Sequence, residues 1–145
     1  MGDSSYVLAS DGARWAFGDN SLGQLFDGTH RGRALPVRST VDRTPIDGLA
    51  GICYLSLGMD GTLWACGENE SGQLGDGTVI PRYTPVRVMG GVRSASISWD
   101  HLVIAKTDGS LWACGANSSG QLGDGTTKDR RSPVRVTLPA EGAGL

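Results

Sequence analysis

Three aspartates recur in the same tripeptide and are the first candidates for chemistry in this chain. Asp27, Asp76 and Asp124 each begin an Asp-Gly-Thr. Several carboxylates together can bind a cation or exchange protons, but calcium loops place such oxygens within a few residues of one another. Here each tripeptide supplies one carboxylate and lies far along the chain from the next. The pattern therefore favours turns, in which Asp and Thr side chains bond to nearby backbone, over a metal site.

The histidines and cysteines do not form a recognisable reactive arrangement. The chain has two His and three Cys, namely His30, His101, Cys53, Cys66 and Cys114. They show neither a Cys-x-x-Cys pair nor metal-ligand spacing, and no Ser/His/Asp or Cys/His set can be assembled from the sequence. Cysteines outside such patterns are usually small buried apolar residues. We predict no catalytic residues, no metal, no cofactor and no enzymatic activity.

The loop after each Asp-Gly-Thr is better suited to binding. Its basic and aromatic residues differ from one copy to the next, and variable loops on a constant scaffold commonly carry binding. A basic arc of this kind would suit an acidic protein surface or phosphates, although ordinary solvated loops remain the alternative. The candidate partner-binding residues here are Arg31, Arg33, Arg82, Tyr83, Lys128, Arg130 and Arg131.

A second binding candidate is the segment Trp99-Asp100-His101. Trp99 is the only tryptophan outside a repeated position, and tryptophan is a common anchor of protein interfaces. A tryptophan buried between sheets is an equally good interpretation. We therefore predict Trp99, Asp100 and His101 as partner-binding residues and leave the burial of Trp99 open.

These candidates are carried by a unit that recurs about every 48 residues. Two clean copies run over 63–78 and 111–126, and a degenerate copy runs over 14–29; the repeated tryptophans lie 49 and 48 residues apart. Residues that recur in this way usually serve the scaffold. The positions we assign to the scaffold are Trp15, Trp64, Trp112, Gly67, Gly115, Asn69, Asn117, Gln73 and Gln121.

Each copy has the pattern of a small antiparallel sheet. In the third copy, apolar runs over 101–107 and 110–115 flank Asp108-Gly109, which is a strong hairpin signal. A strand around 92–98 precedes the hairpin, and a strand that starts at Pro133 follows it at an edge, where the missing N–H is tolerated. The repeated tryptophans alternate with Cys or Phe along their strands, so we expect them to pack between sheets.

A sheet of four short strands cannot bury both faces alone, so neighbouring units must stack, as the blades of a β-propeller do. We predict an all-β fold with three four-stranded antiparallel blades in one array over 1–145. Blade 1 spans about 1–40, blade 2 about 41–89 and blade 3 about 90–137. The tail, 138–145, is a candidate to complete an inner strand.

The repeated motif resembles the regulator of chromosome condensation repeat. The run Gly-x-Asn-x-x-Gly-Gln-Leu-Gly over 67–75 and 115–123, each followed by a Pro-Val strand, carries the resemblance, which covers essentially the whole chain. It implies a seven-bladed propeller. Members act as guanine-nucleotide exchange factors, chromatin binders, photoreceptors, ubiquitin-ligase scaffolds and secreted inhibitors. The family's His is present only at His101, and Phe26 replaces a Gly of the motif.

Three units do not close a seven-bladed ring. Either the chain is a slice of a longer protein, or copies join head to tail, with the tail of one completing the first blade of the next. An open arc of three blades would leave two apolar blade faces in water, and these faces are candidates for self-association.

Charge and hydropathy limit the partners. The 145 residues include 19% charged residues and carry a net charge of −2, so we do not expect nucleic acid or a membrane as partner. No apolar run reaches the roughly 18 residues that span a bilayer and no signal peptide is visible, which favours the cytoplasm. We predict a non-catalytic protein–protein interaction module whose partner the sequence does not identify. The alternatives are a guanine-nucleotide exchange factor or chromatin-associated regulator of a small GTPase, and a secreted propeller-type enzyme inhibitor.

Overall fold

Residues 3–40 and 53–139 are described by a computed structural model, in which they form antiparallel strands joined by turns. The strands are β1 (Ser4–Leu8), β2 (Arg14–Gly18), β3 (Arg33–Arg38), β4 (Cys53–Leu57), β5 (Leu63–Gly67), β6 (Arg82–Met89), β7 (Val92–Ile97), β8 (His101–Lys106), β9 (Leu111–Gly115) and β10 (Arg130–Val136). This confirms the predicted all-β fold. No helix in the described part of the chain has the length and apolar character needed to cross a membrane.

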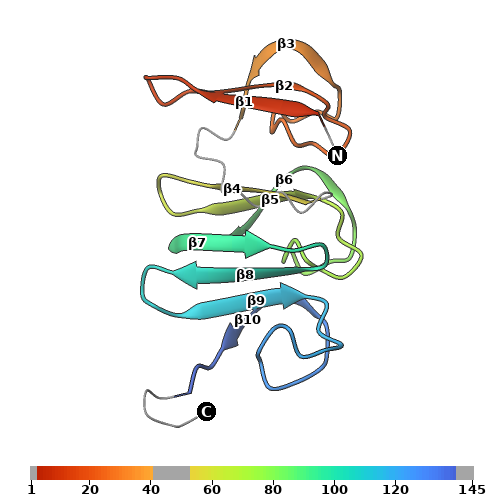
Figure 1. Cartoon of the computed structure of the whole chain (residues 1–145), viewed down its shortest axis with the longest axis vertical. Coiled ribbons are helices and arrows are strands. Elements are labelled where there is room, and N and C mark those ends of the chain that lie inside the picture. The colour runs from red at the N-terminus through yellow and green to blue at the C-terminus, as the bar shows by residue number, and fades with distance from the viewer. Residues whose placement is uncertain (1–2, 41–52, 140–145) are drawn as a thin grey trace.

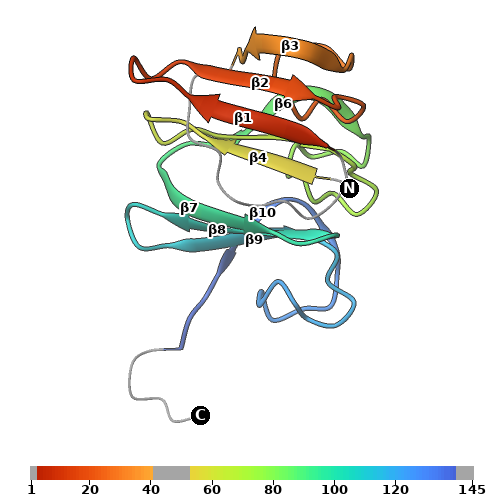
Figure 2. The same ribbon diagram turned by 45° about the horizontal axis from the view of Figure 1, so that its top comes forward.

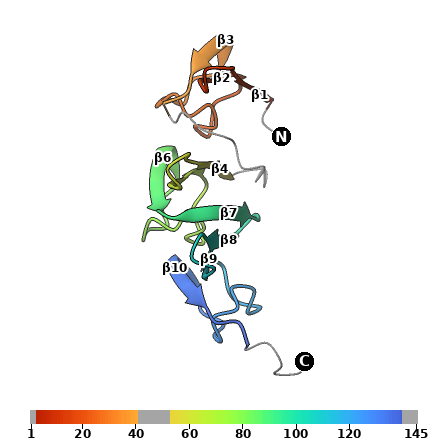
Figure 3. The ribbon, with the colours of Figure 1, turned by 90° about the vertical axis from the view of Figure 1, so that its left-hand side faces the viewer.

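The strands form three sheets, which we call blade 1 (β1-β2-β3), blade 2 (β4-β5-β6) and blade 3 (β10-β9-β8-β7). The blades stack in chain order along the long axis of the molecule (Figures 1 and 3). Within the stack, β4 of blade 2 lies against β7 of blade 3, and blade 1 covers the opposite side of blade 2 (Figure 2). The result is a partial array of propeller blades and not a closed ring.

The number of strands per blade follows the prediction in blade 3, where β7 precedes the hairpin and the Pro-containing β10 lies at the edge. Blades 1 and 2 each have three strands within the described residues. Segment 41–52, in which the fourth strand of blade 2 is predicted, lies outside the described residues, as does most of the predicted tail strand. The blade boundaries therefore stay a prediction.

The hairpins turn at the three Asp-Gly pairs, as predicted, but not through the two-residue turn that Asp-Gly usually indicates, in which both residues have positive φ. Only the glycines have positive φ, 83° at Gly12, 75° at Gly61 and 82° at Gly109. In the first hairpin the amide of Gly12 donates to the carbonyl of Ala9 at 2.9 Å, and the Asp11 carboxylate accepts from the Ala13 amide at 2.9 Å. The Asp side chain thus holds a longer loop that ends in a left-handed Gly.

Alternate side chains of β5 pack against the two neighbouring blades. Leu63 and Ala65 pack in the core between blades 2 and 3, whereas Trp64 and Cys66 pack in the cluster between blades 1 and 2. Trp112 packs against the core between blades 2 and 3, so the predicted interblade packing is confirmed for these two tryptophans. Trp15 is 39% exposed, because it occupies the face of blade 1 on which no described blade stacks.

Candidate functional site

The recurring aspartates form part of a hydrogen-bonded knot in the long loop of each blade. In blade 2 the Asn69 amide donates to the Asp76 carboxylate at 3.2 Å and to the Thr78 carbonyl at 3.1 Å. Arg82 Nε donates to Asp76 Oδ2 at 2.7 Å. The equivalent knots use Asn20, Asp27, Thr29 and Arg33 in blade 1 and Asn117, Asp124, Thr126 and Arg130 in blade 3. The turn interpretation of these aspartates is confirmed.

The hydrogen bonds of the knot lower the pKa of its carboxylates and use their oxygens as acceptors. Partial burial alone would raise the pKa of Asp76, but the hydrogen bonds from Thr78, Arg82 and Asn69 outweigh it, so the pKa is lowered. The pKa of Asp27 is lowered for the same reasons, and the bond from Thr126 leads in lowering that of Asp124. Within residues 3–40 and 53–139, no three His, Cys, Asp or Glu side chains are grouped so that they could hold a metal ion.

The candidate binding segments lie at one end of the blades. The register pairs His101 with Gly115 and Gly115 with Arg130, so β8 and β10 begin where β9 ends. Blades 1 and 2 have the same arrangement. We call this the long-loop end, on the right in Figure 1, opposite the hairpin turns on the left. It collects the basic loops and the Trp99-Asp100-His101 turn of the predicted site.

The structure divides the predicted basic arc into two groups. Arg33, Arg82 and Arg130 form ion pairs with the knot aspartates at 2.8, 2.7 and 2.7 Å, so these side chains brace the loops. The exposed members are Arg31, Tyr83, Lys128 and Arg131. Tyr83 is 42% exposed. Only this second group is available for contact with a partner without breaking the knot.

The turn that carries Trp99 is fixed by backbone hydrogen bonds. The Ser98 amide donates to the His101 carbonyl at 2.8 Å, and the Ala116 amide donates to the Asp100 carbonyl at 2.8 Å. His101 Nδ1 lies 2.8 Å from Asp100 Oδ1. On this fixed backbone the Trp99 side chain is 65% exposed. The structure therefore decides between the two interpretations of Trp99 in favour of the exposed one.

Trp99 borders a shallow depression between blades 2 and 3, which we call the Trp99 depression. It has a volume of about 330 Å³ and is lined by Glu68, Glu70, Ser71, Gln73, Trp99 and Asp100. Glu68 and Glu70 are not among the predicted site residues. The available signal was that Glu70 replaces a Ser found in the other two copies of the motif, at Ser21 and Ser118.

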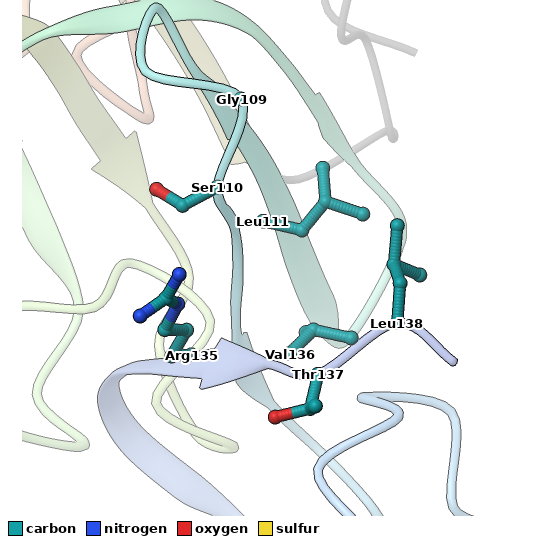
Figure 4. Close-up of a pocket in the computed structure, with 7 residues that line it drawn as sticks. All are labelled: Gly109, Ser110, Leu111, Arg135, Val136, Thr137 and Leu138. Carbon is teal, nitrogen blue, oxygen red and sulfur yellow. The ribbon is translucent and has the colours of Figure 1, made fainter. Parts of the chain in front are cut away.

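A second depression lies on the open face of blade 3 (Figure 4). It has a volume of about 420 Å³ and is lined by Gly109, Ser110, Leu111, Arg135, Val136, Thr137 and Leu138. Leu111 holds the repeat position of Leu63, which packs against blade 3 in the core between blades 2 and 3. The depression is therefore part of the surface on which a further blade would stack.

The cysteines are buried and free, as expected of small apolar residues. Burial raises the pKa of Cys53 to about 11 and that of Cys114 to about 12, and it also raises that of Cys66. Thiols in this state are poor nucleophiles and poor metal ligands.

A family model described as the regulator of chromosome condensation (RCC1) repeat matches residues 60–105 and 108–142, which is more than half of the chain. The chain belongs to the RCC1 repeat family. A second RCC1 repeat model matches residues 92–121. No curated protein matches the chain.

Solved structures support the RCC1-like fold. Prp20p from Saccharomyces cerevisiae superimposes with a TM-score of 0.71 at 19% identity, covering 95% of this chain and 37% of Prp20p. Yeast RCC1 (Prp20) bound to Kap60 gives 0.68 at 19% identity, with 95% and 36% covered. Human WBSCR16 gives 0.53 at 20% identity, with 94% and 51% covered. The chain thus spans between about a third and a half of the length of these proteins.

Proposed function

We propose that this RCC1-repeat chain is a non-catalytic module that binds a protein partner through its long-loop end. The observation that carries the proposal is the exposed Trp99 on a hydrogen-bonded turn. Exposing a large apolar ring on a fixed backbone costs solvation free energy that a partner recovers on binding, and preorganisation lowers the entropy lost on association. The exposed Tyr83 extends the apolar surface of the same end.

The similar structures support a protein as the class of partner. The yeast protein Prp20p is described with its binding to Gsp1p and histones, and yeast RCC1 (Prp20) with Kap60 bound to it. Those partners are all proteins. Because the likeness extends over little more than a third of Prp20p, we transfer the class of partner and not its identity.

The test is capture of partners from an extract of the source organism, followed by cross-linking mass spectrometry. The Trp99→Ala/Tyr83→Ala variant should capture its partner at least about tenfold less well, because interface aromatics commonly contribute more than 1 kcal/mol each. The matched control is Met59→Ala, since Met59 is 91% exposed at a hairpin turn. Loss of capture with Met59→Ala and retention with the double variant would reject the long-loop end.

The nature of the captured protein separates the finer alternatives. A small GTPase whose nucleotide release the chain accelerates would establish exchange activity in place of simple binding. A second copy of the chain would establish self-association through the open end faces, where Val7 of blade 1 is 51% exposed and Leu138 of blade 3 is 63% exposed. An enzyme inhibited by the chain would establish the alternative of a propeller-type enzyme inhibitor.

A further inference from the structure

We infer that the Trp99 depression binds an arginine side chain presented by the partner protein. The inference rests on the proposed function and assigns the chemistry of one part of that surface. It combines three observations, which are the exposed indole of Trp99, the carboxylates that line the same depression, and the presence of Ser in the other two repeats at the position of Glu70.

The indole provides a flat face for a planar cation. The backbone of residues 98–101 is held by the bond between Ser98 and His101 and by the bond between Asp100 and Ala116. A weaker contact of 3.4 Å joins Gln73 Nε2 to the Trp99 carbonyl. The ring is thus presented from a fixed turn. Guanidinium groups stack on tryptophan faces and are more weakly hydrated than ammonium groups, which favours Arg over Lys.

The lining supplies the matching negative charge. Glu68 and Glu70 come from the long loop of blade 2, and Asp100 comes from the turn of blade 3. The lining holds three carboxylates and neither Lys nor Arg. The Asp100 side chain is 47% exposed, and its contact with His101 uses only Oδ1. A guanidinium has five donors in a fork that fits carboxylates in pairs, so it can stack on Trp99 and bind these oxygens at once.

Two acidic residues of the depression, Glu68 and Glu70, hold positions that vary between repeats, whereas residues of the scaffold recur. Gly67, Asn69 and Gln73 recur in all three copies. The position of Glu68 is Asp19 in blade 1 and Ala116 in blade 3. Moreover, Asp19 is bound by Ser21 and Gln24 of its own loop at 3.0 and 2.8 Å. The position of Glu70 is Ser21 in blade 1 and Ser118 in blade 3, so the blade does not need this charge and it is available for recognition.

The experiment uses the whole chain and two synthetic heptapeptides, Gly-Ser-Gly-Arg-Gly-Ser-Gly and the same peptide with citrulline in place of arginine. Citrulline keeps the shape of the side chain and removes its charge. Binding is followed by NMR through the four tryptophan indole N–H signals, with the Trp99 signal assigned from the Trp99→Phe variant. The arginine peptide should shift the Trp99 signal selectively, with a Kd at least about fivefold lower than that of the citrulline peptide.

Two variants separate the contributions of charge and ring. Glu68→Gln/Glu70→Gln should weaken binding of the arginine peptide about fivefold, and added salt should weaken it further. Asp129→Asn is the matched control, because Asp129 lies on the long loop of blade 3, outside the depression, and Asn keeps the oxygen that accepts from the Asn117 amide. It should leave the Kd within about twofold, since distant exposed charges are screened.

Equal binding of both peptides would overturn the arginine assignment while leaving Trp99 as an interface anchor. Failure of the arginine peptide to shift the Trp99 signal would overturn the inference altogether. Neither result would contradict the proposed function, because that function is tested separately by the capture of a partner through the long-loop end. A fivefold loss with Asp129→Asn would also reject the site, because it would show an effect of overall charge.

Discussion

The two junctions between blades join similar sheets with different chemistry. Between blades 2 and 3 the contact is aliphatic, with Leu55, Leu63, Leu74, Leu102 and Ile104 among its buried residues. Between blades 1 and 2 a guanidinium takes the corresponding place. Arg14 is 2% exposed, and its Cζ lies 4.4 Å from the centroid of the Tyr6 ring and 5.1 Å from that of Phe26.

Arg14 occupies the repeat position of Leu63 and Leu111, where an apolar residue is the rule. Its Nη1 lies 3.4 Å from Ser56 Oγ of blade 2, its Nε lacks a hydrogen-bond partner among residues 3–40 and 53–139, and burial lowers its pKa. Phe26 accompanies it at a motif position that is otherwise Gly, and it adopts a φ of 54°. A junction can therefore keep its overall shape while a charged and aromatic filling replaces an aliphatic one.

The loop glycines explain why the two junctions have the same overall shape although different side chains fill them. A Cβ added to Gly72 would lie 2.7 Å from Arg131 Cα of blade 3, and one added to Gly23 would lie 1.9 Å from the Tyr83 carbonyl oxygen of blade 2. On the open face of blade 3, a Cβ on Gly120 would find its nearest neighbour at 3.9 Å. The same motif position is thus a close backbone contact at both junctions, whereas on the face of blade 3 on which no described blade stacks a Cβ would meet only an ordinary van der Waals contact.

The largest predicted effect tests that equivalence. Gly23→Ala and Gly72→Ala should each reduce the free energy of unfolding by about 3 kcal/mol more than Gly120→Ala does, because only they force two backbones apart. The three glycines have φ of 75°, 79° and 72°, so the strain of a left-handed Ala is common to all and cancels in the comparison. Urea denaturation followed by tryptophan fluorescence measures the losses. Equal losses at all three sites would show that the junctions do not depend on these contacts.

A smaller loss of stability is expected when the knot is changed, and because the knot is the same in all three blades this loss does not depend on the type of junction. Asp76→Asn should cost about 2 kcal/mol at pH 7, since Arg82 and Thr78 lose a charged acceptor. The pKa of Asp76 is lower in the folded state than its ordinary value, so its contribution is present above about pH 4 and is lost as the pH falls through the folded pKa. The difference between wild type and variant should therefore shrink between pH 7 and pH 3. A difference that stays constant over this range would mean that the carboxylate charge contributes nothing.

The smallest effect concerns the filling of the first junction. Arg14→Met should raise the free energy of unfolding by about 1 kcal/mol, because the desolvation of a buried charge with no carboxylate partner in the described part of the chain exceeds the free energy returned by the ring contacts. Leu63→Met, the matched change at the equivalent position, should lower it by about 1 kcal/mol through imperfect packing. Calorimetry of the two variants compares the signs. If Arg14→Met destabilised the chain by more than about 2 kcal/mol, the contacts with Tyr6 and Phe26 would outweigh the desolvation of the charge.

The sequence predicts the features of this fold that are determined locally. Asp11-Gly12 and its counterparts set the hairpins because a carboxylate and a left-handed Gly suffice to make the turn. The burial of Arg14 and the exposure of Trp99 depend instead on which blade stacks on which face. Glu70 and Trp99 line one depression only because the loop of blade 2 reaches the turn of blade 3. These two residues are 29 positions apart in the sequence, and their proximity depends on how one blade is placed against the next. The repeat period alone does not give that placement.

Each junction contains a buried cysteine whose alkylation rate measures how readily that junction opens. Cys66 Sγ lies 3.4 Å from the Gly23 carbonyl across the first junction, and Cys114 Sγ lies 3.8 Å from the Gln73 carbonyl across the second. A thiol hidden in this way reacts with an alkylating reagent only while its surroundings are open. The labelling rate at Cys66 therefore records how often blades 1 and 2 separate, and the rate at Cys114 does so for blades 2 and 3. The ratio of the two rates compares the lifetimes of the charged and the aliphatic junction within one molecule and without any added probe.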